Sequence, residues 1–426
     1  MRKMKTINLK KEIENSKKTQ EVILPIMYSY KEKRDSLLSE EEKENLRKEL
    51  RKIKEDSISN IRELKKQAIK NLEKNGIKVI EAKTSKDAIK EIRKIICKEK
   101  IIIKSKSNTL NEINLAKGLK DKELIETDLG DFLVQIFQGK DLHPVLPAVN
   151  LTPKEIADKI REKFKEEIKP NAEEIIKFVR AYLREKIFNA KIGISGANAI
   201  ISDGSIFILE NEGNISLVSR IPEKHIIIAG FDKIVSTKED ALKIIRAAGI
   251  FGTAQAYPVY VNIISGPSKT ADIENKIVSG AQGAKEVYLI LLDNKRSEII
   301  NSEFKELLYC INCGACVNFC PVYHQIFARY GSKNFPGAKG VLSSYFNESG
   351  NSAYNNGAFF CTTCKQCYEN CPTKINLSDL MKKLRKNLVN QGIEPKTISE
   401  MITNIRKYGN PFGDLGGKPP SKLYCC

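Results

Sequence analysis

The residues best suited to chemistry in this chain are eight cysteines that form two copies of one pattern. Each copy reads C-x2-C-x2-C-x3-C-P, a spacing that places thiolates around a cubane of iron and inorganic sulfide. The copies are Cys310, Cys313, Cys316, Cys320 and Pro321, and Cys361, Cys364, Cys367, Cys371 and Pro372. Zinc sites use pairs of cysteines separated by a long gap and do not require a third cysteine at this spacing. We therefore predict two [4Fe–4S] clusters and, with them, one-electron transfer.

The spacing also predicts which cysteines share a cluster. In two-cluster ferredoxins, the cysteine that precedes the proline binds the other cluster. This rule assigns the first cluster to Cys310, Cys313, Cys316 and Cys371. It assigns the second cluster to Cys361, Cys364, Cys367 and Cys320. The prediction is therefore a crossed pair of sites, in which each cysteine run supplies ligands to both clusters.

The composition indicates a folded chain with a basic surface. Hydrophobic residues make up 41% of the 426 residues, which is enough for a core, and the length predicts two to three domains. The formal net charge is +19. Lysines alternate with glutamates in runs such as 41–55, a pattern typical of solvated helix faces, although an anionic partner is the alternative. The chain has no tryptophan and no basic segment interleaved with aromatics, so specific nucleic-acid binding is disfavoured.

The chain also shows no feature of membrane insertion or secretion. No apolar run is long enough to span a bilayer, and the first residues lack the apolar core of a signal peptide. We therefore expect a cytoplasmic protein that is not transmembrane and whose cysteines are free of disulfides. Peripheral contact with a membrane, through a partner, is left open.

The apolar pattern divides the chain into four regions. Residues 1–75 form an N-terminal helical region with an apolar stripe at helical spacing, which Gly76 ends. Residues 76–298 alternate short apolar runs with amphipathic helices, which predicts an α/β domain with mostly parallel strands. Residues 299–392 hold both cysteine runs and a helical stripe after Pro372. Residues 393–426 form a tail that ends in Cys425 and Cys426.

Individual elements can be predicted within these regions. The expected strands of the α/β domain are 77–80, 101–103, 225–228 and 287–292. Residues 199–201 and 206–209 predict a hairpin around Asp203-Gly204, and 215–218 predict a further strand that extends it to a meander. Ser268, Lys269 and Thr270 with Asp272 predict the N-cap of a helix, and the N-terminus of that helix either receives an anion or is a plain cap. His225 begins an apolar strand and is expected in the core. His143 is expected to be structural, with a proton carrier near neutral pH as the alternative.

Several short motifs in the α/β region resemble those of the LUD domain family. They are Lys104–Ser107, Glu126–Asp131, Gly193–Asn198 and Asn211–Asn214. Together with the cysteine runs, they make residues from about 45 to about 390 similar to the lactate utilisation protein B family. The resemblance implies an α/β LUD domain of the NagB/RpiA/CoA-transferase type. It also implies N-terminal helices before that domain and an α-helical ferredoxin domain with two [4Fe–4S] clusters after it.

The resemblance also implies a function. The chain is expected to be the iron–sulfur electron-transfer subunit of a cytoplasmic oxidoreductase complex that oxidises lactate or a related 2-hydroxy acid. It carries no G-x-G-x-x-G nucleotide fingerprint after a strand, so it is not expected to be a complete enzyme alone. Expected partners are a CCG-domain iron–sulfur protein, a LUD-family subunit or a flavoprotein. The segment 405–413 resembles the linker that precedes CCG domains in other proteins.

A ligand site is predicted where the parallel strands end, because open α/β sheets bind ligands at their carboxyl edge. The candidate residues are Lys104, Ser105, Lys106, Ser107, Gly193, Gly196 and Asn198. A solvated loop and an ordinary glycine-rich turn are the alternatives. This site keeps open a second function, in which the LUD domain binds or acts on an acyl, CoA or phosphate-type ligand and the clusters sense redox state. A third alternative is the electron-transfer subunit of a heterodisulfide-reductase-like complex.

Overall fold

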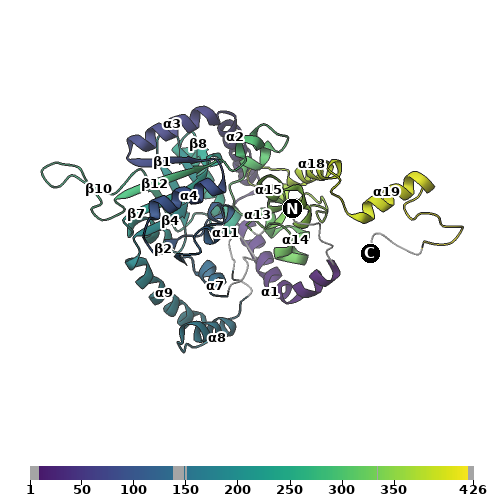
Figure 1. Cartoon of the computed structure of the whole chain (residues 1–426), viewed down its shortest axis with the longest axis horizontal. Helices are drawn as coiled ribbons and strands as arrows, with labels where there is room; N and C mark the ends of the chain where they lie inside the picture. Colours follow the sequence, from purple (N-terminus) through teal and green to yellow (C-terminus); the bar gives the residue numbers. More distant parts are fainter. Residues whose placement is uncertain (1–8, 138–147, 149–150, 333, 421–426) are drawn as a thin grey trace.

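The chain forms a larger lobe built around a sheet and a smaller helical lobe that holds the cysteine runs (Figure 1). The computed structural model describes residues 9–137, 148, 151–332 and 334–420. The predictions for His143, Cys425 and Cys426 lie outside these residues. Within the described part of the chain, no helix combines the length and the apolar character needed to cross a membrane.

A six-stranded parallel sheet forms the centre of the larger lobe. Its strands run in the order β1-β12-β7-β4-β2-β3, and all neighbouring pairs are parallel. They are β1 (Ile77–Ala82), β2 (Ile101–Lys104), β3 (Glu123–Glu126), β4 (Ile192–Gly196), β7 (Lys224–Gly230) and β12 (Glu286–Leu292). The four strands predicted from apolar runs are confirmed. Parallel sheets bury both faces and so favour unbroken apolar runs.

Helices cover both faces of this sheet. Ile226 of β7 packs in a cluster with α4 (Ser85–Ile96), and Ile227 packs in a cluster with α3 (Ile61–Lys74), because neighbouring residues of a strand point to opposite faces. Gly76 adopts a φ of 89° between α3 and β1, so the predicted end of this helix is confirmed. The other helices of the lobe are α5 (Asn108–Glu112), α6 (Leu115–Gly118), α7 (Leu129–Phe137), α8 (Pro153–Phe164), α9 (Ala172–Asn189), η1 (Phe231–Lys233) and α11 (Lys238–Thr253).

A second sheet of four strands packs beside the first. Its order is β8-β5-β6-β9, with β5 (Ala199–Ile201), β6 (Ile206–Glu210), β8 (Ile234–Val235) and β9 (Tyr260–Ile264). The predicted hairpin of β5 and β6 is confirmed. The strand predicted at 215–218 is wrong, because these residues lie in the helix α10 (Asn214–Arg220). Ile215 and Val218, three residues apart, are both buried, and the Glu210 carboxylate accepts a hydrogen bond from the Ser216 N–H at 2.9 Å.

The helix N-cap predicted at Ser268–Asp272 is also wrong. The segment belongs to an antiparallel hairpin of β10 (Lys269–Thr270) and β11 (Val278–Ser279), which projects from the larger lobe at the left of Figure 1. The Thr270 hydroxyl accepts a hydrogen bond from the Asp272 N–H, two residues ahead, at 3.3 Å. Such a bond belongs to a local turn, whereas an N-cap residue reaches two or three positions into a helix.

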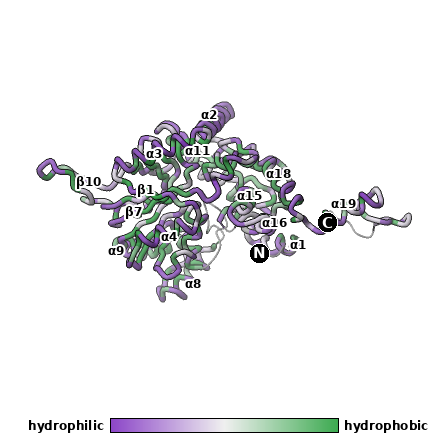
Figure 2. The backbone as a smooth tube through the Cα atoms, turned by 45° about the horizontal axis from the view of Figure 1, so that its top comes forward, coloured by the Kyte–Doolittle hydropathy of each residue, from purple (hydrophilic) through white to green (hydrophobic). Residues whose placement is uncertain are grey.

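The helical lobe combines the first helices of the chain with the segments around the cysteines. Helix α1 (Leu9–Asp35) contacts α14 and buries Ile23 and Met27 there. Helix α2 (Glu40–Ser59), which includes the alternating charges of 41–55, is largely hydrophilic (Figure 2). The others are α12 (Arg296–Ile300), η2 (Lys305–Tyr309), α13 (Ala315–Asn318), α14 (Pro321–Ile326), η3 (Phe327–Arg329), α15 (Gly337–Asn347), α16 (Gly350–Asn355), α17 (Gln366–Glu369), α18 (Leu377–Asn390) and α19 (Lys396–Tyr408). The helical stripe predicted after Pro372 is confirmed, because α18 buries Leu377, Leu380, Met381, Leu384 and Leu388.

The chain enters the helical lobe through Arg296, the first residue of α12. Its guanidinium donates two hydrogen bonds of 2.8 Å to the carboxylate oxygens of Glu112 and one to Asp232. All three side chains are nearly buried, with exposed fractions of 12%, 5% and 8% for Arg296, Glu112 and Asp232. Two buried carboxylates therefore share this arginine, and Asp232 also pairs with Lys233 at 3.5 Å.

We expect the substitution Arg296→Met to lower the stability of the protein by roughly 3–5 kcal/mol, because the buried Glu112 carboxylate loses its ion pair and Asp232 keeps only Lys233. The measurement is the thermal unfolding midpoint of the full chain. Arg93→Met is the matched control, since Arg93 pairs with Asp121 at the exposed surface, where a salt bridge contributes about 0–1 kcal/mol. Equal midpoints for the two variants would show that the Arg296 network does not stabilise the fold.

Candidate functional site

Four cysteines from the two runs meet around one small cavity of the helical lobe. They are Cys310, Cys313, Cys316 and Cys371. Gly314, with a φ of 84°, turns the chain into α13, so Cys316 lies on the first turn of that helix. Cys371 arrives from the second run, just after α17. The fold therefore brings together the four residues that the spacing rule assigned to the first cluster.

The remaining four cysteines of the two runs lie in a second group. Cys320, Cys361, Cys364 and Cys367 are near enough for their charges to influence one another. The Cys320 sulfur accepts a hydrogen bond from the Tyr323 N–H at 3.5 Å. Cys364 is exposed, whereas all four cysteines of the first group are partly buried. The second group thus reaches the protein surface at Cys364, whereas no cysteine of the first group is exposed.

The electrostatics of both groups fit iron–sulfur clusters. Burial, followed by the neighbouring thiols, raises the pKa of Cys313 and holds the pKa of Cys316 well above its usual range. Burial also raises the pKa of Cys320 to about 11 and that of Cys367 to about 12. Because their pKa values are raised, these neighbouring buried thiols would lose their protons only when a cation binds beside them. The iron of a cluster would be such a cation.

The positions of the cysteines can be compared with the needs of a single metal ion and of a cubane. Among the residues that the structure describes, no group of three or more His, Cys, Asp or Glu side chains is placed to hold one ion. In a cubane, each thiolate binds a different iron, so the four sulfurs surround a volume and do not meet at one point. The cavity between Cys310, Cys313, Cys316 and Cys371 is consistent with such an arrangement.

Two lysines add positive charge beside the first group. The Lys233 ammonium donates a hydrogen bond of 2.9 Å to the Cys310 carbonyl oxygen, and the Lys339 ammonium donates to the Asn312 side-chain oxygen. The Cys310 sulfur accepts a hydrogen bond from the Asn312 N–H at 3.4 Å. Burial raises the pKa of the Cys310 thiol, but Lys339 and Lys233 outweigh it and bring that pKa below its usual value. Charges and hydrogen bonds of this kind set cluster potentials.

A larger cavity, of about 340 Å³, connects the strand ends of the larger lobe with the first cysteine group. Its walls include Ser107 after β2, Asn198 after β4 and Cys313 of the first cysteine run. Gly252, near the end of α11, also lines it, and a Cβ there would lie 3.0 Å from the Cys313 carbonyl oxygen. The carboxyl edge of the sheet therefore faces the cysteines across a space large enough for a small molecule.

The predicted ligand residues separate into two sets. Lys106, Ser107, Gly196 and Asn198 line the cavity. Lys104 and Ser105 are buried in the sheet edge, where Lys104 forms an ion pair with Glu126. Gly193 lies outside the cavity lining, under α10, where a Cβ would lie 2.0 Å from the Val218 carbonyl oxygen. Gly193 thus allows close packing of helix on strand.

Acidic residues that the ligand-site prediction omitted also lie at this edge. Burial raises the pKa of Asp131 to about 7, although Lys106, 3.6 Å away, and Lys104 lower it. Burial and then Asp128 raise the pKa of Glu212, which lines the cavity. The edge therefore holds one carboxyl, Asp131, that exchanges a proton near neutral pH, and a second, Glu212, whose pKa lies above its ordinary value. The sequence shows Asp131 and Glu212 within the family motifs, but it does not show that their side chains are buried, which is what raises their pKa.

The raised pKa of Asp131 predicts a pH-dependent stability. The folded chain holds this proton up to about pH 7, whereas the unfolded chain releases it near pH 4. The resulting stabilisation is present below about pH 4 and is lost as the pH rises through about 7. The thermal unfolding midpoint of Asp131→Asn, measured relative to that of the parent, should therefore increase as the pH rises from about 5.5 to about 8.

The control for this prediction is Asp121→Asn. Asp121 is exposed, and its hydrogen bonds from Arg93 lower its pKa, so it does not titrate in this pH range. The difference between this variant and the parent should stay constant with pH. A constant difference for Asp131→Asn as well would contradict the raised pKa of Asp131.

Comparison with known proteins places these features in a family. A LUD domain model matches residues 65–292, and a 4Fe-4S dicluster domain model matches residues 306–375. The chain is 34% identical over 343 residues to lactate utilization protein B of Bacillus cytotoxicus, which covers 79% of this chain and 70% of that protein. It is 33% identical over 345 residues to lactate utilization protein B 2 of Bacillus mycoides, which covers 80% of this chain and 71% of that protein.

One solved structure is also similar. It is a DUF162 family protein from Deinococcus radiodurans, with a TM-score of 0.31 and 13% sequence identity. The match covers 55% of this chain and 98% of that protein.

Proposed function

Because the chain belongs to the LUD domain family and, over most of its length, to the family of lactate utilization protein B, we propose that it is the electron-transfer subunit of a complex that oxidises lactate or a related 2-hydroxy acid. The 4Fe-4S dicluster domain supports iron–sulfur clusters as its cofactors. The observation that carries the proposal is the cavity that joins the strand ends to Cys313. It gives an electron donor a place beside the first cysteine group.

In this proposal the two cysteine groups are the ligand sets of two [4Fe–4S] clusters. Cys310, Cys313, Cys316 and Cys371 hold one, and Cys320, Cys361, Cys364 and Cys367 hold the other. When bound, the clusters supply one-electron transfer. The chain's own contribution is to position the thiolates and to set the charge around them, chiefly through Lys233 and Lys339 near Cys310.

The two ligand sets face different neighbours. The first adjoins the cavity, so a donor held there lies next to the Cys313 loop. The second exposes Cys364, so a partner protein can approach it from outside. We propose a CCG-domain iron–sulfur protein, a LUD-family subunit or a flavoprotein as that partner. Helix α19 buries none of its residues and exposes Ile405 and Tyr408. This exposed apolar surface supports a contact between a partner protein and the C-terminal part of the chain.

The cavity offers both cationic and acidic groups to a substrate that loses protons as it is oxidised. Lys106 and Lys233 can pair with a carboxylate, and Asp128, Glu210 and Glu212 line the same space. Oxidation of a 2-hydroxy acid to a 2-oxo acid releases two electrons and two protons. Asp131 does not line the cavity but lies 3.6 Å from Lys106, which does; with a pKa of about 7, Asp131 can accept a proton near neutral pH.

The proposed function is tested on the complex that contains this chain. The complex is isolated without oxygen through a tag on the chain, and D- and L-lactate are added in turn. We expect one of them to reduce the clusters, which is detected by electron paramagnetic resonance and by bleaching of the visible absorbance. 2-Hydroxyisobutyrate, which has no hydrogen on the hydroxyl-bearing carbon, should leave the spectra unchanged. Spectra that respond to dithionite but to neither lactate would reject the proposal.

The ligand assignment is tested by iron analysis. The parent chain should hold about eight irons and eight sulfides, as two four-iron clusters require. Cys371→Ser should retain about half of them, because it removes a ligand of the first set. The control is Cys97→Ser, since Cys97 is exposed and lies in neither cysteine run. Full iron content in Cys371→Ser, or an equal loss in Cys97→Ser, would count against the assignment.

A further inference from the structure

A second cavity lies at the opposite end of the parallel sheet, close to the amino ends of β7 and β12. Its volume is about 440 Å³, within the range of small-molecule sites. His225 and Val287, the second residues of these strands, form its floor, and Ser268 and Lys269 of the projecting hairpin form part of its rim. It shares no lining residue with the cavity that reaches Cys313. It is therefore a separate site.

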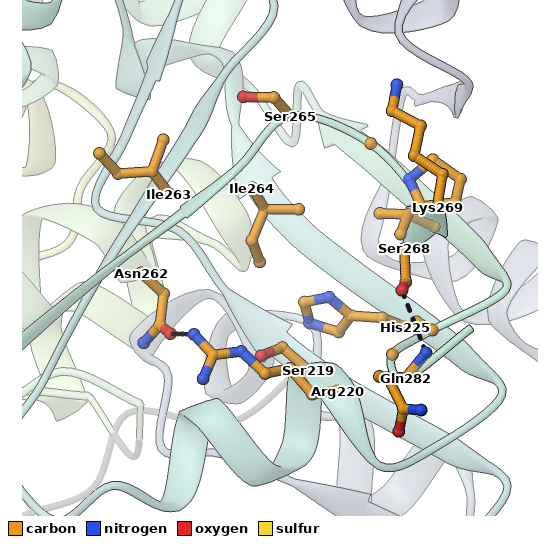
Figure 3. A pocket seen from close by; sticks show the side chains of 15 residues that line it. Ser219, Arg220, His225, Asn262, Ile263, Ile264, Ser265, Ser268, Lys269 and Gln282 are labelled. Carbon is orange, nitrogen blue, oxygen red and sulfur yellow. Dashed lines mark hydrogen bonds between the residues drawn. The ribbon is translucent and has the colours of Figure 1, made fainter. Parts of the chain in front are cut away.

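His225 presents a hydrogen-bond donor to this cavity. The side chain is fully buried, and Figure 3 shows its ring reaching into the space between Ile264 and Arg220. Its Nε2 lies 2.8 Å from the Ser195 hydroxyl oxygen, which has no other partner among the described residues. A buried hydroxyl must place its proton on an acceptor, so Ser195 donates to Nε2. The ring proton then lies on Nδ1.

The Nδ1 atom of His225 has no hydrogen-bond partner within the described part of the protein, although it is buried. Buried donors of this kind are rare in folded proteins unless a ligand or a water completes them. Burial also lowers the pKa of His225 to about 3, so the ring is neutral at physiological pH and the tautomer is the one that Ser195 selects. The cavity thus contains one unsatisfied N–H donor on its floor.

Two further hydrogen-bond donors, Arg220 and Ser268, line the cavity. Arg220 donates to the Asn262 side-chain oxygen at 2.8 Å, and the Asn262 amide donates in turn to Glu210 at 2.6 Å, so the guanidinium is held at the wall (Figure 3). The Ser268 hydroxyl oxygen accepts a hydrogen bond from the Gln282 N–H at 3.4 Å, which leaves the hydroxyl proton available. None of the described residues that line the cavity is acidic. Donors with a net positive charge favour an anion.

We propose that this cavity binds a small metabolite through an oxyanion group, a carboxylate or a phosphate, which accepts hydrogen bonds from His225 Nδ1, Ser268 and Arg220. The cavity is larger than the anionic group alone, so the rest of the metabolite occupies the space toward the hairpin. The Asn262–Glu210 contact links this site to the first cavity, because Glu210 also lines the space that reaches Cys313. The site is thus placed to recognise a second compound apart from the electron donor.

The test uses the full chain with its clusters in the oxidised state and follows the nitrogen resonances of its histidines by NMR. The chain has 3 histidines, so the His225 signals can be assigned by substitution. Inorganic phosphate and acetate are titrated separately. We expect one of them to shift the His225 Nδ1 resonance in a saturable way, phosphate indicating a phosphate-bearing metabolite and acetate a carboxylate-bearing one.

Two variants and a control make the test specific. Arg220→Met, at an exposed position, should raise the concentration needed for half-saturation at least about tenfold, because a charged donor is lost. Ser268→Ala should raise it by a smaller factor. Arg62→Met removes an exposed arginine of the same lobe and should behave as the parent. The inference is overturned if neither anion shifts the resonance, or if Arg220→Met and Ser268→Ala bind like the parent.

Discussion

The position of the first cysteine group depends on a buried network of charges at the end of β7. Asp232 contacts the cations of Arg296 and Lys233, and Lys54 donates a hydrogen bond to the Asp232 carbonyl oxygen. Burial raises the pKa of Asp232, but Arg296, Lys233 and Lys54 outweigh it and hold that pKa well below its usual range. Lys233 also binds the Cys310 carbonyl oxygen. Because buried charges are stable only when paired, this network holds the cysteine loop against the sheet.

That attachment determines what the carboxyl edge of the sheet can do. In an open α/β sheet this edge normally faces solvent and binds ligands. Here Asn198 and Ser107 face Cys313 across a cavity, so a ligand at the edge lies beside the thiolates. Asp131, Lys106 and Glu212 add proton-exchanging and charged groups to the same edge. The strand ends and the first cysteine group thereby share one space between the two lobes.

The amino ends of the strands, at the opposite end of the sheet, form a cavity that the sequence did not predict. His225 was predicted to be a core residue, and it is fully buried, but it also forms the floor of a cavity that the apolar pattern did not indicate. The apolar pattern was also insufficient at residues 215–218, for which it predicted a strand. Hydrogen bonds from Ser216 to Glu210 on β6 favour a helix there instead. In both cases a partner distant along the chain, or on another element, decided the outcome.

The sequence by itself determined the features that depend on local spacing. Cysteine and proline positions defined two cysteine runs and predicted a crossed ligand assignment, and unbroken apolar runs predicted the parallel strands, because both patterns arise from short-range geometry. Only the tertiary structure decided which cysteine group adjoins the strand ends and which exposes Cys364. Asn198, Gly252 and Cys313 are far apart along the chain, and their meeting depends on buried charge pairs that carry no periodic signal.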